Sequence, residues 1–217
     1  RPLAIRSSSL LEDSHYQPFA GVYSTYMIPH VDDKDHMMRM LCDAIKGVYA
    51  SVFYADSKAY MTATSNVIDQ EKMAIIIQEV IGEQVNDWYF PSFSGVGRSL
   101  NYYPSGNERT EDGVAEVAVG LGKYIVDGGI SLRFSPKHPK SALQTSELKL
   151  ALRDTQTKMY ALDMHDATDF KVDDGFNILK ISVQDVAKTG ALRYMVSTFD
   201  LQDNLLRDSD FGTGRRV

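Results

Sequence analysis

The residues best suited to chemistry lie near the start of the chain, where an arginine, two carboxylates and a glycine follow one another. An apolar lead-in at residues 3–5 stops at Arg6, and three serines, Glu12, Asp13 and Gly21 come next. This pattern predicts a short strand that delivers Arg6 to the edge of a sheet. A planar guanidinium there can hold phosphate or carboxylate oxygens through two parallel hydrogen bonds. Arg6 is therefore predicted to bind an anion.

The elements expected to position these residues alternate between strands and helices, which predicts the α+β class with mixed sheets and flanking helices. Apolar residues recur at helical spacing from Asp33 to about Ala63, so one long helix, or two joined near Tyr54, is expected. The run from Met73 to Ile81 is rich in Ile and Val and predicts a buried strand. Strands are also expected at 3–6, 115–119, 131–134 and 177–183, and residues 19–28 are expected to form a loop that leads into a second extended segment. Residues 89–103 are expected to form strands broken by turns. A helix start is expected at 120–129, a helix over 146–162, and a turn or short helix at 184–188.

Composition narrows the class of protein. The chain has 217 residues, of which 43% are hydrophobic, so it can bury one good core or two small ones. Its formal net charge of −6 and the lack of a basic stripe argue against nucleic acid as a partner, because phosphate-backbone binding needs clustered Lys and Arg. No apolar run is long enough to span a membrane, and no signal peptide is recognisable, so no membrane partner and a cytoplasmic location are expected.

The single cysteine, Cys42, has no partner for an internal disulfide. It stands among apolar residues at helical spacing, which predicts a small buried hydrophobe on the inner face of a helix. The five histidines are scattered without the spacing of metal ligands, and none is predicted to bind a metal or to carry a phosphoryl group.

The opening pattern R-S-S-x-x-x-E-D-x-x-x-x-x-F-A-G-x-x-x-T resembles the nucleotide-binding domain of phosphoenolpyruvate synthase, pyruvate phosphate dikinase and relatives such as rifampicin phosphotransferase. Two further segments, Met73–Ile81 and Glu116–Gly128, follow in the order that the family requires. The resemblance implies a partial ATP-grasp-like domain that binds ATP and Mg²⁺. It also implies partners within the same full-length protein, namely phosphohistidine and phosphoenolpyruvate/pyruvate domains.

The resemblance also implies which residues contact the nucleotide. Arg6 and Thr25 match residues that contact ATP, and Gly21 matches a glycine on the loop that covers the phosphates. Gln78 matches a glutamine beside the adenine, and the backbone groups of Glu79 and Val80 would face the adenine edge. No residue of this chain is assigned a catalytic or metal-binding role.

Each of these assignments has a structural alternative. Arg6 could pair with Glu12 or Asp13 in a salt bridge. Gly21 could serve only a turn, Thr25 could be an ordinary strand residue, and Gln78 could satisfy a backbone group. Glu12 and Asp13 could cap the turn that follows the strand.

The chain also departs from the family pattern. Lys123 follows Gly120-Leu121-Gly122 where the family has glutamate, Gly97-Arg98 replaces a hydrophobic pair, and Val22 stands at a position that is commonly glutamine. The acidic metal-binding segment and the Q-x-R-P motif have no counterpart up to Val217. These departures indicate a divergent branch, and the ligands of Mg²⁺ are expected outside this chain.

The function expected from the resemblance is that of the ATP-binding part of a dikinase-type phosphotransferase, which passes a phosphoryl group to a carrier histidine and then to pyruvate or a related acceptor. The chain alone is expected to be an inactive piece of a larger protein, with a nucleotide-binding region over 1–140 and a C-terminal extension over 141–217. Two rival hypotheses are a non-catalytic scaffold or regulatory domain that keeps the family fold and an unrelated α+β domain with chance motif matches.

Overall fold

The computed structural model describes residues 1–9, 12, 21–63, 72–165, 170–173, 175–200 and 202–208. They form two compact units. Unit 1 comprises Arg1–Ile81 and Leu162–Leu179, and unit 2 comprises Gly82–Ala161 and Lys180–Val217. Neither unit ends near residue 140. The division into a nucleotide-binding region over 1–140 and a C-terminal extension over 141–217 therefore stays a prediction.

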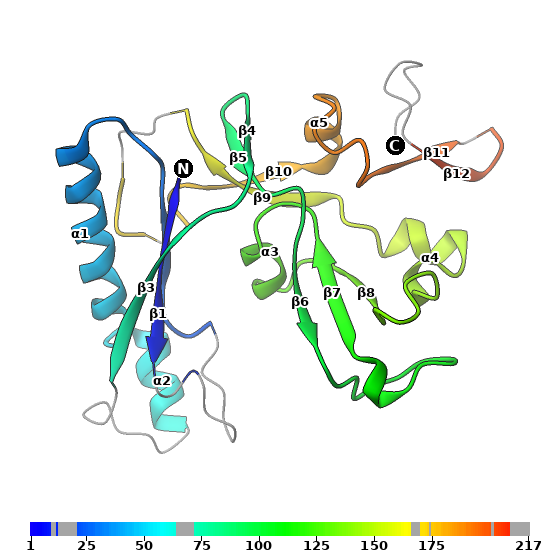
Figure 1. Cartoon of the computed structure of the whole chain (residues 1–217), viewed down its shortest axis with the longest axis horizontal. Coiled ribbons are helices and arrows are strands. Elements are labelled where there is room, and N and C mark those ends of the chain that lie inside the picture. The colour runs from blue at the N-terminus through cyan, green and yellow to red at the C-terminus, as the bar shows by residue number, and fades with distance from the viewer. Residues whose placement is uncertain are drawn as a thin grey trace. The chain divides into compact units, whose positions relative to one another are not determined.

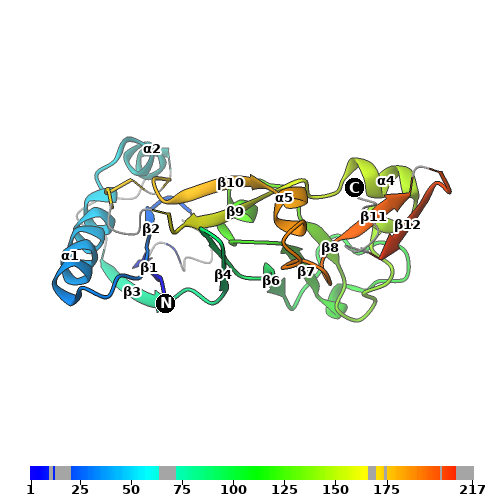
Figure 2. The ribbon, with the colours of Figure 1, turned by 90° about the horizontal axis from the view of Figure 1, so that it is seen from above.

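Unit 1 is built on a three-stranded antiparallel sheet with the order β2-β1-β3. A long helix, α1, packs against one face of that sheet, as Figures 1 and 2 both show. The elements are β1 (Leu3–Ser9), β2 (Thr25–Ile28), α1 (Lys34–Ser51), α2 (Ala55–Ala63) and β3 (Met73–Glu79). The second of the two helical alternatives is therefore correct, because the helix predicted from Asp33 to Ala63 breaks before Ala55.

Local chemistry explains where α1 begins and how closely it packs. The Asp33 carboxylate accepts the backbone N–H groups of Asp35 and His36 at 2.9 and 3.1 Å, which caps the first turn and holds the pKa of Asp33 below its ordinary value. Farther along, a Cβ on Gly47 would come within 2.7 Å of the Tyr26 ring. Only glycine lets the helix approach the sheet this closely.

The core of unit 1 lies between α1 and the sheet. Ile5, Tyr26 and Ile28 from the strands are almost completely buried against Ala44 and Val48 of the helix. Burying each large apolar side chain contributes about 1.5–3 kcal/mol. Apolar packing against α1 therefore fixes one face of the sheet, and the residues that alternate with these core residues along the strands lie on the other face.

Unit 2 contains short antiparallel sheets and short helices. Its strands form the orders β10-β9-β5-β4, β6-β7-β8 and β11-β12, and β9 and β10 cross the boundary with unit 1. The elements are β4 (Glu83–Val85), β5 (Trp88–Phe90), β6 (Ser94–Arg98), η2 (Thr110–Asp112), β7 (Val114–Ala118), α3 (Lys123–Val126), β8 (Leu132–Phe134), η3 (Leu143–Thr145), α4 (Leu148–Arg153), β9 (Lys158–Asp163), β10 (Ile178–Ser182), α5 (Val183–Ala187), β11 (Ser197–Asp200) and β12 (Leu205–Asp208). The predicted α+β class is confirmed, as are the strands predicted at 115–119, 131–134 and 177–183.

Four local predictions are wrong. The first strand does not stop at Arg6 but runs on to Ser9, so Arg6 lies in the middle of the central strand. The strand from Met73 is not buried, because it lies at an edge of the described sheet, and Ile77 is 48% exposed. The helix predicted over 146–162 ends at Arg153, and its last apolar residues, including Met159, belong to β9. Cys42 is exposed, because the buried side of α1 runs through Met40, Ala44 and Val48.

No helix among the described residues is both long and apolar enough to cross a membrane.

Candidate functional site

Arg6 and Thr25 lie side by side on the sheet face opposite α1. Side chains alternate along β1, so Ile5 and Ser7 point toward the buried side while Arg6 is exposed on the other. Arg6 is directly opposite Thr25 of β2 in the antiparallel register, and directly opposed residues point to the same side. We call this side of the β2-β1-β3 sheet the open face.

Gln78 shares the open face. It stands opposite Ala4 on β3, and Ala4 is two residues from Arg6 along β1, roughly 7 Å away in an extended strand. An even spacing keeps the side chains on one face. The structure therefore brings together three of the six residues predicted to contact the nucleotide: Arg6, Thr25 and Gln78.

Glu79 and Val80 are arranged differently. The side chain of Glu79 is on the α1 side of the sheet and lies 3.5 Å from Arg1, an exposed ion pair. The Val80 backbone N–H donates to the Pro2 carbonyl at 3.0 Å. Because hydrogen-bonded and non-hydrogen-bonded pairs alternate in an antiparallel ladder, the neighbouring pair of Leu3 and Glu79 exchanges no backbone hydrogen bonds. The backbone N–H and C=O of Glu79 thus point outward from β3, whereas the N–H of Val80 is already used.

Gly21 begins the segment that leads into β2, and its φ of 80° lies in the left-handed region that glycine tolerates best. Phe19 and Ala20 of the same motif lie outside the described residues. Tyr23, two positions on, is buried beside Val52 and Met61, so the chain enters β2 in a fixed position.

Two fully buried serines of the helical region help to fix this segment. The Ser51 hydroxyl accepts the Ser24 backbone N–H at 3.2 Å, and the Ser57 hydroxyl lies 2.6 Å from the Ser51 carbonyl and 3.4 Å from the Val22 carbonyl. Sequence reasoning missed both residues. Ser51 continues the buried spacing of Ala44 and Val48 along α1, which is the signal that could have revealed it.

The salt-bridge alternative for Arg6 receives no support from Glu12. The Glu12 carboxylate accepts the Ser7 hydroxyl at 2.7 Å and the Ser9 backbone N–H at 2.9 Å, while the Glu12 N–H donates to the Ser9 hydroxyl at 3.1 Å. Glu12 therefore closes the turn after β1, as its capping alternative predicted. Asp13 lies outside the described residues. The side chain of Arg6 makes no hydrogen bond or ion pair within the part of the chain that the structure describes.

The Gly120-Leu121-Gly122 segment of unit 2 has a packing role. Gly120 has a φ of 84°, and a Cβ there would come within 2.6 Å of the Tyr160 carbonyl. Lys123, at the position of the family glutamate, pairs with Asp127 at 3.3 Å. Burial and the neighbouring Asp127 carboxylate raise the pKa of the Tyr160 hydroxyl. Lys123 therefore belongs to a local polar group of unit 2.

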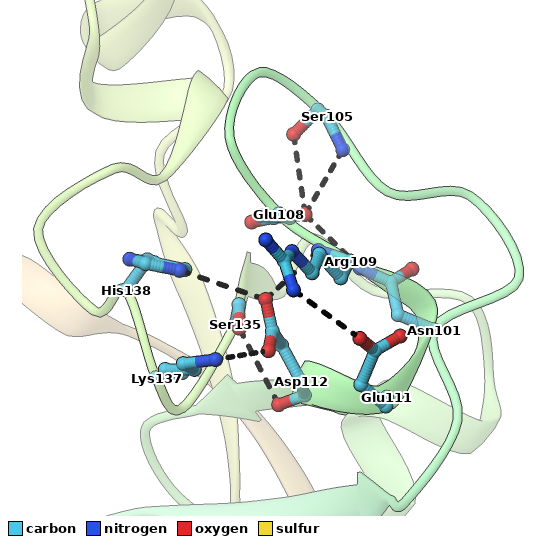
Figure 3. Close-up of polar contacts among 9 residues, drawn as sticks. All are labelled: Asn101, Ser105, Glu108, Arg109, Glu111, Asp112, Ser135, Lys137 and His138. Carbon is cyan, nitrogen blue, oxygen red and sulfur yellow. Dashed lines mark hydrogen bonds and ion pairs between the residues drawn. The ribbon is translucent and has the colours of Figure 1, made fainter.

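A denser polar group of unit 2 surrounds Asp112 (Figure 3). The side chain of Asp112 is only 2% exposed, and its carboxylate lies 2.8 Å from Lys137 Nζ, 3.5 Å from His138 Nε2 and 2.8 Å from the Arg109 backbone nitrogen. The hydrogen bond from Lys137 is the main cause that holds the pKa of Asp112 below its ordinary value. Among the described residues, no group of three or more His, Cys, Asp or Glu side chains is arranged to hold a metal ion.

A cavity of about 550 Å³ lies within unit 2 and has mainly apolar walls. The charged residues in its lining, Asp154 and Lys188, are paired with Arg153 and Asp185. Within the described part of unit 2, this cavity therefore offers no unpaired charge to a phosphate group. Its large apolar lining residues include Phe93, Val117, Ile130, Leu132, Leu152 and Met195.

The chain matches one protein family over most of its length. The family model of the pyruvate phosphate dikinase AMP/ATP-binding domain matches residues 1–193. The chain belongs to this family. The resemblance predicted from the Arg6 motif is thus confirmed, and the α+β fold is that of an ATP-grasp-like nucleotide-binding domain.

Two curated relatives of this dikinase-family chain carry phosphotransfer names. A phosphoenolpyruvate synthase of Aeropyrum pernix is 25% identical over 171 residues, which cover 78% of this chain and 18% of that protein. The uncharacterized phosphotransferase YvkC of Bacillus subtilis is 28% identical over 131 residues, which cover 60% of this chain and 14% of that protein. The chain therefore spans less than a fifth of the length of either relative.

Proposed function

We propose that this chain is the ATP-binding part of a dikinase-type phosphotransferase, in which Arg6 holds the phosphates and the outer edge of β3 faces the adenine. The observation that carries the proposal is the open face of unit 1, where Arg6, Thr25 and Gln78 share one side of a sheet. The Arg6 guanidinium has no hydrogen-bond or ion-pair partner among the described residues. An exposed guanidinium on a central strand can receive an anion without first breaking a native ion pair.

Phosphoryl transfer asks a protein mainly for positioning and charge neutralisation. Arg6 would contribute a bidentate cation, and the Thr25 hydroxyl beside it would donate to a phosphate oxygen. Gly21 would allow the backbone to approach the phosphates because it has no Cβ. The backbone N–H and C=O of Glu79, rather than the N–H of Val80, would meet the adenine edge, with Gln78 beside it.

In the full-length protein, the phosphoryl group would pass to a histidine of another domain and then to pyruvate or a related acceptor. The described residues do not supply a ligand set for Mg²⁺, so no step is assigned to the metal through this chain. The chain by itself is proposed to bind nucleotide weakly and to catalyse no transfer.

Isothermal titration of the full chain with ATP tests the proposal. Arg6→Ala removes hydrogen bonds to a charged group, which are worth about 1.5–3 kcal/mol, so the Kd for ATP should rise roughly 10- to 100-fold. Arg109→Ala is the matched control, since Arg109 is an exposed arginine of unit 2. The Kd of Arg109→Ala for ATP should equal that of the unaltered chain. Equal Kd values for all three proteins would overturn the role of Arg6, and submicromolar binding by the unaltered chain would contradict the expectation of weak affinity.

A second candidate, the non-catalytic scaffold, is favoured by one observation. Lys123 replaces the family glutamate and is paired with Asp127, so this position carries a cation with a partner of its own. The scaffold predicts no ATP binding at all by the chain. It also predicts that the full-length protein consumes no ATP with pyruvate or any other acceptor, whereas the phosphotransferase predicts ATP consumption with one of them.

A further inference from the structure

Three consecutive serines follow Arg6 on β1, and the strand sorts them onto two faces. Ser7 and Ser9 lie on the side covered by α1 and are 5% and 3% exposed. Both have their hydroxyls engaged by Glu12: Ser7 Oγ donates to the carboxylate at 2.7 Å, and Ser9 Oγ accepts the Glu12 N–H at 3.1 Å. Their role is therefore accounted for by the turn that ends β1.

Ser8 is the exception among the three. It stands between Ser7 and Ser9, so its side chain points to the open face, as Arg6 does two residues earlier. It is only half-buried, and its hydroxyl makes no hydrogen bond within the described part of the chain. Its cross-strand neighbour is Ala74, whose small side chain leaves room beside the hydroxyl.

The position of Ser8 relates it to the anion site. Ser8 and Arg6 are roughly 7 Å apart along the strand, a span that a chain of linked phosphates can bridge. Because β2 runs antiparallel to β1, the chain reaches Thr25 from the end of the sheet at which β1 finishes. Ser8 thus lies on the side of Arg6 from which the Gly21 segment enters.

We propose that the Ser8 hydroxyl is a further nucleotide ligand, which donates a hydrogen bond to a phosphate oxygen next to the one held by Arg6. The inference rests on the proposed function, since it assumes that the open face binds a nucleotide. It assigns a role to the middle serine, whose hydroxyl, unlike those of Ser7 and Ser9, is not bonded to Glu12. The ligand is expected to be a polyphosphate, because linked phosphate groups can contact Arg6 and Ser8 at the same time across this distance.

A pair of variants with the same shape isolates the hydroxyl. Ser8→Thr keeps it, and Ser8→Val has nearly the same volume without it; both β-branched residues suit a strand. A hydrogen bond to a charged group is worth about 1.5–3 kcal/mol, so Ser8→Val should raise the Kd for ATP at least 10-fold relative to Ser8→Thr. The Kd for adenosine should be the same in both variants, and their melting temperatures should agree.

The outcomes separate the two proposals. If the unaltered chain does not bind ATP, the proposed function fails and the role of Ser8 fails with it. If the chain binds ATP and Arg6→Ala weakens binding, but Ser8→Thr and Ser8→Val bind ATP equally, only the role of Ser8 is overturned. An equal loss of affinity for ATP and adenosine in Ser8→Val would also overturn it, because the hydroxyl would then not act on the phosphates.

Discussion

The open face of unit 1 and the Asp112 group of unit 2 are both rich in polar side chains, but they differ in how far those side chains satisfy one another. In unit 2, the buried Asp112 carboxylate has Lys137, His138 and a backbone N–H as partners (Figure 3). On the open face, the side chains of Arg6 and Ser8 make no hydrogen bond within the described residues. The first group is complete in the free protein, and the second has capacity left for a ligand.

This contrast separates structural from binding residues in this chain. Folded proteins pair nearly all their buried polar groups, so a completed network such as that of Asp112 is explained by folding alone. Side chains that lie on a well-packed strand with their donors unused are held in place by the backbone but not by partners. Preorganised donors of this kind can meet a ligand at low cost. Arg6 and Ser8 fit this second description.

The greatest loss of stability is expected at Gly120 of unit 2, which lies in a segment that matches the family pattern but has a packing role. Gly120→Ala should lower the free energy of unfolding by about 3 kcal/mol, since a left-handed φ strains a residue with a Cβ and the added atom overlaps the Tyr160 carbonyl at 2.6 Å. Chemical denaturation monitored by circular dichroism measures the change.

Gly97 provides the control for this substitution. A Cβ at Gly97 would meet nothing within 4 Å, and its φ is not in the left-handed region. Gly97→Ala should therefore change stability by less than about 1 kcal/mol. Similar destabilisation by Gly97→Ala and Gly120→Ala would show that close packing and the left-handed φ of Gly120 are not what makes its substitution costly.

Sequence reasoning predicted well those features that depend on neighbouring residues. The start of α1 near Asp33 and the strand near Ile178 each follow from local spacing and propensity. Features that depend on which strands and helices pack against each other were predicted poorly. Met73–Ile81 was expected to be buried because it is apolar, yet β3 lies at an edge of the sheet formed by the described residues, and Ile77 is exposed although it is on the side of α1. Strand order and coverage are tertiary properties that an apolar run does not encode.

The candidate site divides in the same way. Arg6, Thr25 and Gln78 were found by their motifs, and strand register later placed them on one face. Ser51 and Ser57 were missed because their partners lie 27 and 35 residues away in sequence, at Ser24 and Val22. Ser8 was missed because the sequence alone does not tell which serine of a run turns away from Glu12.

A smaller effect is expected from Ser57, a buried serine that helps to fix the segment leading into β2. Ser57→Ala would leave the buried carbonyl of Ser51 without this donor, at a cost of about 1–2 kcal/mol in unfolding free energy. ATP affinity should fall modestly as well, because the segment from Gly21 to Thr25 loses an anchor. Thermal unfolding and ATP titration measure the two effects on one protein sample. Ser146→Ala, at an exposed serine whose hydroxyl donates to the nearby Leu143 carbonyl, should leave both unchanged. If Ser146→Ala has the same effects as Ser57→Ala, burial of the hydroxyl is not the cause.

The smallest effect should come from the charge of Asp112, whose partner Lys137 has a side chain that is 60% exposed and therefore screened by solvent. The pKa of Asp112 is lowered from an ordinary value of 3.8, so its ionised form stabilises the folded state above about pH 4, and this contribution is lost as the pH falls through the lowered pKa. Asp112→Asn should accordingly melt at a lower temperature than the unaltered chain at pH 7, and this gap between the two melting temperatures should narrow below pH 4.

Asp43→Asn provides the control, because it removes an exposed ion pair with Lys46 and should show almost no gap in melting temperature at pH 7. A gap for Asp112→Asn that stays constant down to pH 2.5 would mean that lost packing, not lost charge, produces it, and that the Asp112 group is held together by shape alone.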